Sequence, residues 1–273
     1  MSAQRSTRRH LLALGAGAGV LASVDALVLE PRWLEVTTHD VHVAGLPASL
    51  DGFSIGQITD AHLERLGEVE ESLVVAARSA ALNLLVLTGD IVDCVSKLPL
   101  LHEFCDAFRA LGVPVVATLG NWEHWGKVPL DALATVYAST GATLLVNASQ
   151  TLDGAVSIVA TDDSTGGDVR LDRALRHRSG APASLLLTHS PELLDRLPAG
   201  VRFDLALAGH THGGQVTLGP WAPVLPPGSG RFVGGHYDVS SGPAYVSRGT
   251  GTSLVPARFT CRPEMPIFKL RRA

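Results

Sequence analysis

The chain has 273 residues, of which 46% are hydrophobic and 18% are charged, which excludes an intrinsically disordered chain and favours a globular protein with a substantial core. Its net charge of −4 argues against nucleic acid as the main partner, because phosphate binding requires a basic face. The three cysteines are widely spaced and include no C-x-x-C pair, so we predict no disulfide framework.

The first 30 residues differ from the rest of the chain. The pair Arg8-Arg9 precedes LLALGAGAGVLASVDALVL, a pattern that resembles a twin-arginine export signal. An ordinary membrane anchor or a buried helix is the alternative, although Asp25 weakens a permanent span. We expect residues 1–30 to be a twin-arginine-type signal or membrane anchor. Residues 31–273 should then form one domain on the extracytoplasmic face of the cell membrane or in the cell envelope.

From residue 33 onward, strand-like and helix-like segments alternate. Helical periodicity predicts helices over 68–82 and 98–111, and from residue 213 onward only short strands are expected. The alternation predicts an α/β domain whose apolar strands are covered on both faces. Short apolar runs predict strands at 33–38, 53–59, 84–88, 113–119, 142–146, 156–161, 184–188, 204–208, 244–247 and 266–270.

Five of these predicted strands are followed, directly or after one glycine, by Asp, Asn or His. A lone Asp after a strand is more often a helix cap, but histidine is a poor cap. Ligands collect at the carboxyl ends of the strands in an open α/β sheet, so we predict one shared site there. The polar segments are Asp60-Ala61-His62, Gly89-Asp90, Gly120-Asn121, His189 and Gly209-His210-Thr211-His212.

The side chains of this predicted site indicate metal binding. Imidazole, carboxylate and amide donors suit Mn, Fe or Zn better than calcium, and Mg is also compatible. The donors are too many for one ion, and they suffice for two divalent ions if one carboxylate bridges them. Such a pair of ions is used for phosphoester hydrolysis. The predicted ligands are Asp60, His62, Asp90, Asn121, His189, His210 and His212.

The motifs D-x-H, G-D-x-x-D, G-N-x-E, T-H and G-H-T-H, in this order between residues 58 and 214, resemble the calcineurin-like metallophosphoesterase superfamily. The flanking segments EPRWLEV, VSRGTG and CRPE resemble its exported phosphodiesterase branch. The resemblance implies a four-layer α/β/β/α sandwich with a dimetal site at the C-terminal ends of the strands. It implies one ion held by Asp60, His62, Asp90 and His212, and a second that shares Asp90 and adds Asn121, His189 and His210.

The sequence departs from this family directly after Asn121. The family commonly has a histidine there that contacts the phosphate or protonates the leaving group, whereas this chain has Trp122, whose indole has no proton to transfer near neutral pH. His124 is a candidate for the missing acid, although a loop histidine is more often simply solvated. His236 is a weaker candidate. The residues to which we assign catalytic roles are His210, Asp90 and His124.

These features predict a dimetal-dependent phosphoester hydrolase, in the leading interpretation a phosphodiesterase acting on an envelope or lipid-linked phosphoester or pyrophosphate. The alternative is a catalytically degraded envelope protein that binds metal or a phospho-ligand, which only Trp122 favours. A zinc peptidase is disfavoured because H-E-x-x-H is absent. We expect WAPVLPP (221–227) to be a packed loop rather than a lipid-facing lip. No sequence feature favours a particular oligomeric state.

Overall fold

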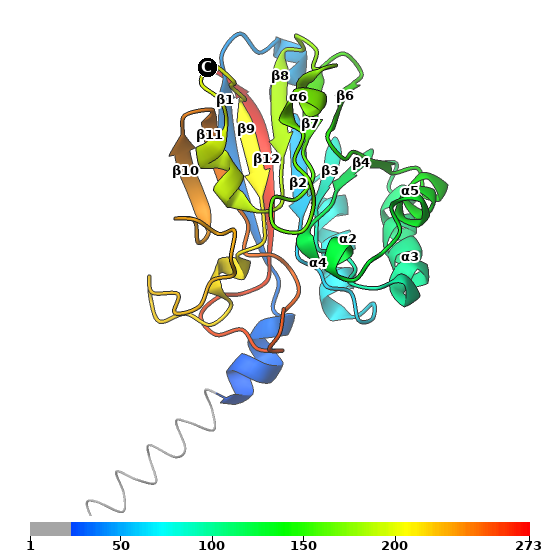
Figure 1. Ribbon diagram of the computed structural model, residues 1–273, viewed down its shortest axis with the longest axis vertical. Helices are drawn as coiled ribbons and strands as arrows, with labels where there is room; N and C mark the ends of the chain where they lie inside the picture. Colours follow the sequence, from blue (N-terminus) through cyan, green and yellow to red (C-terminus); the bar gives the residue numbers. More distant parts are fainter. Residues whose placement is uncertain (1–22) are drawn as a thin grey trace, which may run out of the picture.

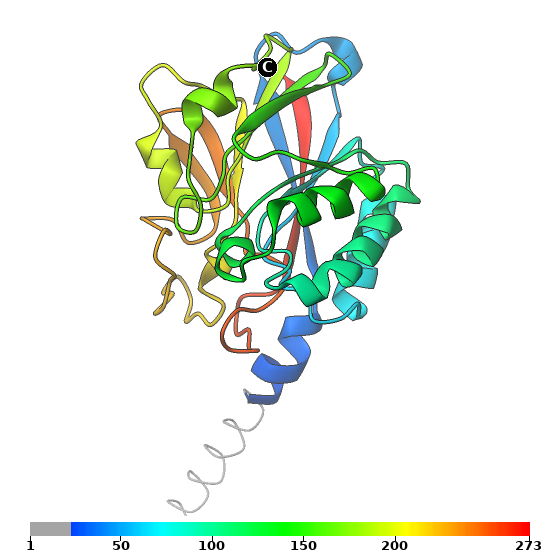
Figure 2. The same cartoon turned by 45° about the vertical axis from the view of Figure 1, so that its right-hand side comes forward.

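The computed structural model describes residues 23–273, so the predicted export residues Arg8 and Arg9 lie outside the described range. Within this range, two six-stranded sheets face each other, and helices lie on the outer faces (Figures 1 and 2). No helix in residues 23–273 combines the length and the apolar character that crossing a membrane would require.

The first sheet is mostly parallel. β12 runs parallel to β1 and antiparallel to β2, and β2 to β5 run parallel to one another. β12 is nine residues long, so the region after residue 213 contains a longer strand than the sequence predicts. In spatial order the strands are β1 (Glu35–Val43), β12 (Glu264–Arg272), β2 (Ser54–Ile58), β3 (Leu84–Thr88), β4 (Val115–Thr118) and β5 (Thr143–Leu144).

The second sheet has a parallel centre and antiparallel edges. Its two edge strands, β6 and β10, are not predicted from the sequence, because their residues are polar or only partly buried and form no apolar run. In spatial order the strands are β10 (Gly235–Val239), β11 (Gly242–Val246), β9 (Leu205–Ala208), β8 (Ala183–Leu187), β7 (Val156–Ala160) and β6 (Ala148–Leu152).

Helices cover the outer face of each sheet. α2 (Glu68–Ser79), α3 (Leu98–Arg109) and α5 (Leu130–Ser139) pack on the first sheet. α6 (Leu171–Leu175) and the helical turn Pro191–Arg196 pack on the second. The short helix α4 (Asn121–Trp125) begins at the predicted site. Further helical turns are Asp25–Leu29, Glu30–Arg32, Ala48–Leu50, Val95–Lys97 and His212–Gly214.

The alternation of side chains along β3 shows how the layers are held together. Leu84 and Val86 point into the core between the two sheets, whereas Leu85 and Leu87 point into the core beneath α2, α3 and α5. All four are fully buried, which explains why the strand reads as a continuous apolar run. The predicted four-layer α/β/β/α sandwich is confirmed.

Candidate metal centre

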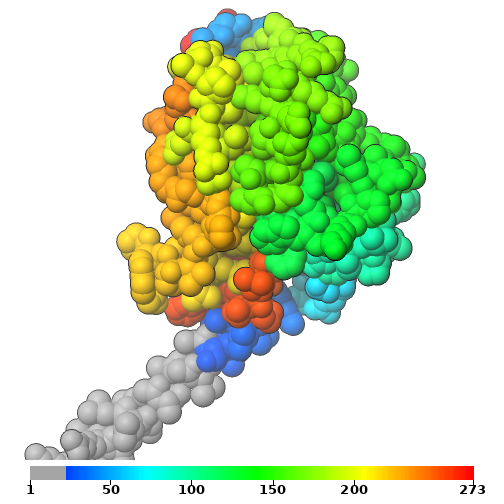
Figure 3. Space-filling view, in the orientation of Figure 1, coloured from blue at the N-terminus to red at the C-terminus, as the bar shows by residue number. Residues whose placement is uncertain are grey.

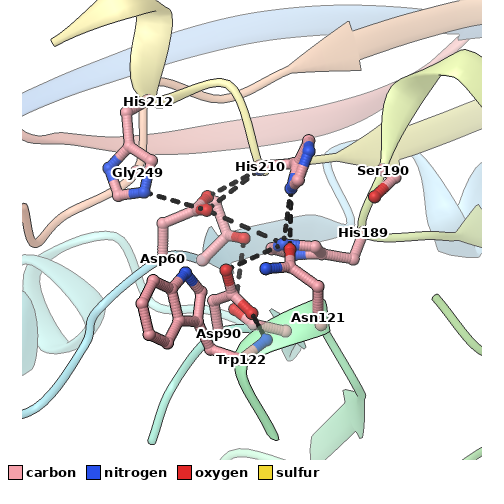
Figure 4. Close-up of polar contacts among 12 residues, drawn as sticks. Asp60, Asp90, Asn121, Trp122, His189, Ser190, His210, His212 and Gly249 are labelled. Carbon is pink, nitrogen blue, oxygen red and sulfur yellow. Dashed lines mark hydrogen bonds and ion pairs between the residues drawn. The ribbon is translucent and has the colours of Figure 1, made fainter. Parts of the chain in front are cut away.

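The ends of five strands from both sheets meet at one edge of the sandwich. β2, β3 and β4 of the first sheet and β8 and β9 of the second are each followed by a polar segment at this edge (Figure 4). The structure brings all seven predicted ligands together and buries each of them. Their exposed fractions run from 0% to 8%, for Asp60, His62, Asp90, Asn121, His189, His210 and His212.

Two groups of three side chains have the geometry of metal sites. In each group the ligand atoms lie within 4.8 Å of one another, and every member is buried. Among residues 23–273, these are the two groups of His, Cys, Asp or Glu side chains that could hold an ion. The first triad is Asp60, His62 and His212, and the second triad is Asp90, His189 and His210.

Asp90 belongs to the second triad and also faces the first. Its Oδ2 atom is 3.1 Å from His189 Nε2 of the second triad and 3.8 Å from His62 Nε2 of the first. Its Oδ1 atom accepts the backbone N–H of Trp122 at 2.8 Å, which leaves Oδ2 to face both groups. Asp60 Oδ1 also lies 3.9 Å from His189 Nε2, so the two triads are neighbouring halves of one centre.

The ring orientation of His189 is fixed from behind. Its Nδ1 donates to the carbonyl oxygen of Thr88 at 2.8 Å, since a carbonyl can only accept. In the neutral ring, Nε2 therefore carries a lone pair, and this lone pair points at the Asp90 carboxylate. Such a backbone carbonyl behind a histidine is the usual way to fix the tautomer of a metal ligand.

His210 is fixed in the same manner but through its other nitrogen. Its Nε2 donates to the carbonyl oxygen of Pro227 at 2.6 Å, so Nδ1 carries the lone pair. That lone pair faces the side-chain oxygen of Asn121 at 2.8 Å and Nε2 of His189 at 3.3 Å. Acceptor atoms converge here, and a proton or a cation must lie between them. The residues therefore fit a divalent ion with N and O ligands.

The titration behaviour of the metal-free centre leads to the same conclusion. Burial raises the pKa of Asp60 to about 6. Burial alone would lower the pKa of His189, but the charge and hydrogen bond of Asp90 outweigh it and raise that pKa well above the usual value. Burial and the neighbouring His189 lower the pKa of His210 to about 4. Two buried carboxylates thus require positive charge, which either a proton on His189 or bound cations can supply.

The backbone of the centre is strained. Five of the seven predicted ligands have φ in the left-handed region that non-glycine residues seldom adopt. Such conformations persist where the surrounding structure determines them, and they concentrate at functional sites. The five φ values are 53° at Asp60, 43° at His62, 55° at Asp90, 73° at His210 and 50° at His212.

Glu123 organises the loop that carries Asp90. Its buried carboxylate accepts the backbone N–H groups of Asp90 at 3.0 Å, Ile91 at 2.7 Å, Val92 at 3.2 Å and Gly120 at 2.9 Å. In the sequence, Glu123 stands out only as the last residue of the motif G-N-x-E. Glu123 therefore supports the centre without belonging to either triad.

Trp122 forms part of the wall beside the first triad. Its half-buried ring lies 5.8 Å from the ring of His62 and 5.5 Å from that of Trp125, in edge-on contacts. The indole contributes bulk and apolar surface at the point where the family commonly has a histidine. It has no group that could protonate an oxygen near neutral pH.

The structure does not bring His124 or His236 into either triad. His124 Nε2 lies 2.7 Å from Asp162 Oδ1, and this hydrogen bond raises the pKa of His124. His236 lies on the edge strand β10, where its Nε2 is 2.9 Å from Nδ1 of His39. The acid role of either residue stays a prediction.

Sequence reasoning missed two buried supports of the centre. Asp163 accepts a hydrogen bond from the Ser190 hydroxyl at 2.5 Å, beside His189. A signal for it was present, because Asp162 and Asp163 directly follow the predicted strand 156–161. Arg258 is fully buried and donates to the carbonyl oxygens of Arg248 at 2.9 Å and Gly251 at 2.6 Å. No local pattern marks Arg258, because these partners are backbone carbonyl oxygens, which every residue carries.

Residues 53–214 match the family model for calcineurin-like phosphoesterases. The chain belongs to the calcineurin-like phosphoesterase family. The match contains all seven buried Asp, Asn and His side chains of the centre, so this member is a metal-dependent phosphoesterase that retains the residues for two ions.

Individual relatives cover most of the chain. The uncharacterized metallophosphoesterase YkuE of Bacillus subtilis is 32% identical over 257 residues, which are 90% of this chain and 88% of that protein. The phosphodiesterase YaeI of Escherichia coli is 28% identical over 88% of this chain and 90% of its own. The UDP-2,3-diacylglucosamine pyrophosphatase LpxG of Chlamydia muridarum is 26% identical over 75% of this chain and 76% of its own.

Proposed function

We propose that this phosphoesterase is a phosphodiesterase that acts on an envelope or lipid-linked phosphoester or pyrophosphate. The observation that carries the hydrolytic part is the position of Asp90 Oδ2, 3.1 Å from His189 and 3.8 Å from His62, between two buried triads. One ion would be held by Asp60, His62, His212 and the shared Asp90. The second would be held by Asp90, Asn121, His189 and His210. Mn, Fe and Zn suit this donor set, and Mg is compatible with it.

A pair of bound divalent ions supplies a nucleophile from water at neutral pH and stabilises the charge that develops on the phosphoryl oxygens. The chain's own residues hold the geometry for that chemistry. Thr88 and Pro227 fix the rings of His189 and His210 through their carbonyl oxygens. The Nδ1 side of His210 faces the centre, close to where attacking and equatorial oxygens would lie.

The leaving group has no obvious proton donor. Trp122 cannot protonate it, and His124, the stronger of the two predicted candidates, is hydrogen-bonded to Asp162 at 2.7 Å. Such a centre suits esters whose leaving group departs with help from metal charge alone. The half-buried indole of Trp122 would instead form an apolar wall for a bulky diester.

The substrate class rests on two relatives and on the chain's first residues. YaeI carries the name phosphodiesterase, and LpxG the name of a pyrophosphatase of a diacylated sugar nucleotide. The arginine pair Arg8-Arg9 and the apolar segment after it support export by the twin-arginine route and attachment to the membrane through residues 1–30. If so, the variant Arg8→Lys/Arg9→Lys stays in the cytoplasm, and unchanged export would support an ordinary anchor.

The test is a hydrolysis screen of metal-loaded protein with an aryl phosphodiester, an aryl phosphomonoester and a lipid-linked pyrophosphate. A phosphodiesterase hydrolyses the diester or the pyrophosphate faster than the monoester. The alternative, a degraded binding protein of the envelope, binds metal and hydrolyses none of the three. A preference for the monoester would contradict the proposed substrate class and leave the family membership intact.

A further inference from the structure

Exposed apolar side chains gather at the end of the molecule that holds the metal centre. They come from residues 24–33, 216–224 and 254–255, which include most of the large apolar side chains exposed in the described part of the chain. Figure 3 shows these segments at the lower end of the molecule, in blue, gold and orange-red. We call the exposed apolar side chains of these three segments the apolar rim.

Hydrogen bonds join the three segments of the apolar rim into one surface. The side chain of Gln215 donates to the carbonyl oxygen of Val255 at 2.8 Å and accepts the N–H of Ser253 at 2.7 Å. The N–H of Arg258 donates to the carbonyl oxygen of Ala26 at 2.9 Å. The rim is therefore a built feature of the folded domain, and it includes residues that precede residue 31.

The apolar rim adjoins the metal centre at two points. The loop that begins at His212 carries the exposed Trp221 and returns to Pro227, whose carbonyl oxygen binds His210. A pocket of about 190 Å³ opens beside His62 and is lined by Arg32, at the end of the first rim segment. A surface that contacts the rim would therefore lie next to the centre.

Two rim residues are held outward by the backbone. The N–H of Leu218 donates to the carbonyl oxygen of Trp221 at 2.9 Å, and this tight turn leaves the two side chains 58% and 60% exposed.

The prediction that residues 221–227 form a packed loop is therefore wrong, since Val224 is also 74% exposed. Leu254 has φ of 62° and is 91% exposed, so it combines an unfavourable backbone with an apolar side chain in water. Packing among residues 23–273 gives no reason for this arrangement.

We propose that the apolar rim docks on the surface of a lipid bilayer, so that the metal centre lies next to the headgroups; this deepens the proposed function and rests on it. The rim's side chains at 216–224 and 254–255 project from turns and bends, and those at 24–29 from a short helix. Such scattered apolar side chains suit a lipid interface better than a protein partner that needs a complementary shape. The guanidinium carbon of Arg262 lies 3.4 Å from the centre of the exposed Trp33 ring, and Trp and Arg are favoured at lipid headgroups.

The sequence that precedes the rim is also apolar. Residues 11–22 contain no charged side chain, and they join the folded domain at this same end, where the described residues begin. An apolar segment entering there would bring the rim close to a bilayer. The bilayer is therefore favoured over a second copy of the chain as the occupant.

The test uses the full chain and a fluorescent label. The variant Leu254→Cys is prepared with Cys94→Ser, because Cys105 and Cys261 are buried, and it is labelled with a polarity-sensitive dye. The matched control is Leu130→Cys in the same background, since Leu130 is 51% exposed on α5, away from the rim. Both proteins are bound to vesicles of phosphatidylglycerol and phosphatidylcholine that contain brominated lipid.

We expect the label at 254 to shift to the blue and to be quenched by brominated lipid, and the label at 130 to do neither. Equal quenching at both positions, or none at either while the protein floats with the vesicles, would overturn the proposal. A blue shift at 254 without lipid, together with a dimer in sedimentation, would identify a second copy as the occupant and overturn it as well.

A hydrolysis assay separates this proposal from the proposed function. The variant Trp221→Ser/Leu254→Ser should hydrolyse a phosphodiester embedded in vesicles about tenfold more slowly than the unaltered chain, with its rate on a soluble aryl diester unchanged. The control Val75→Ser/Leu130→Ser should alter neither rate. Equal rates of the two variants on vesicles would contradict the docking surface. If the unaltered chain hydrolysed no diester at all, that result would contradict the proposed function alone.

Discussion

The carboxylate of Glu123 accepts a hydrogen bond from the backbone N–H of Asp90 at 3.0 Å. A side chain on α4 therefore fixes the loop after β3, which carries Asp90. The same carboxylate binds three more N–H groups of the two loops. An acceptor with two oxygens satisfies all four donors in a buried place, where an unpaired donor is costly.

Glu123→Gln should therefore destabilise the centre. The amide would present N–H groups to two backbone donors, and each abandoned donor costs about 1–3 kcal/mol. We expect a loss of that size in the free energy of unfolding, measured by chemical denaturation of metal-free protein, together with weaker metal binding. The control is Glu64→Gln, whose carboxylate is 76% exposed. Equal stability of the two variants would contradict the supporting role.

Asp90 should be the most damaging single ligand to lose. Its Oδ2 faces both triads, whereas Asn121 supplies one neutral oxygen to the second. Asp90→Asn should lower the metal content and abolish turnover, and Asn121→Ala should keep one ion largely bound. Elemental analysis of the purified variants measures this. Two ions per chain and a near-normal rate in Asp90→Asn would rule out its bridging position.

Gly249 leaves space for Asp60. A Cβ atom there would lie 2.6 Å from Cβ of Asp60, and its φ of 68° already disfavours other residues. Gly112 has φ of 69° and nothing within 4 Å of an added Cβ, so Gly112→Ala is a control for the backbone term, which is about 1–2 kcal/mol. Gly249→Ala should bind about one ion fewer and lose activity, and Gly112→Ala should keep both. Full metal content in both variants would show that Asp60 can move without loss.

Because Trp122 replaces an acid, the rate of hydrolysis should depend strongly on the leaving group of the substrate. General acid catalysis contributes about 10²–10⁴ in rate, and a good leaving group such as a nitrophenolate does not need it. Trp122→His should therefore raise turnover of alkyl phosphoesters more than of aryl ones. Paired rate measurements on the two ester classes test this, and no change on either class would refute this account of Trp122.

His124→Ala tests the other source of a proton. A selective loss on alkyl esters would assign the acid to His124, despite its hydrogen bond to Asp162. An equal effect on alkyl and aryl esters would leave His124 with a structural role beside α4.

The sequence identifies the strands that end at the centre because each is buried on both faces and therefore reads as an apolar run. β3 and β8 are examples, and the polar residue that follows each is the one that reaches the site. The edge strands β6 and β10 are not found in this way, because their residues are partly exposed and form no apolar run.

The supports of the centre are harder to predict than its ligands. Arg258 donates mainly to backbone carbonyl oxygens, which any residue can supply, so the sequence gives no sign of its partners. The hydrogen bonds from the Asp90 loop to Glu123 form only because β3 and β4 lie side by side in the sheet, so that their ends are close together. Exposure of Trp221 and Leu254 also depends on the turn geometry rather than on composition.

In the proposed function, two ions held in neighbouring triads together support phosphodiester hydrolysis. The most direct measurement is a titration of metal-free protein with Mn²⁺ that records bound metal and the rate on an aryl phosphodiester in the same samples. We predict that the rate rises with the second equivalent of bound metal and is lost again on chelation. Full activity with one ion per chain, or with none, would contradict the account.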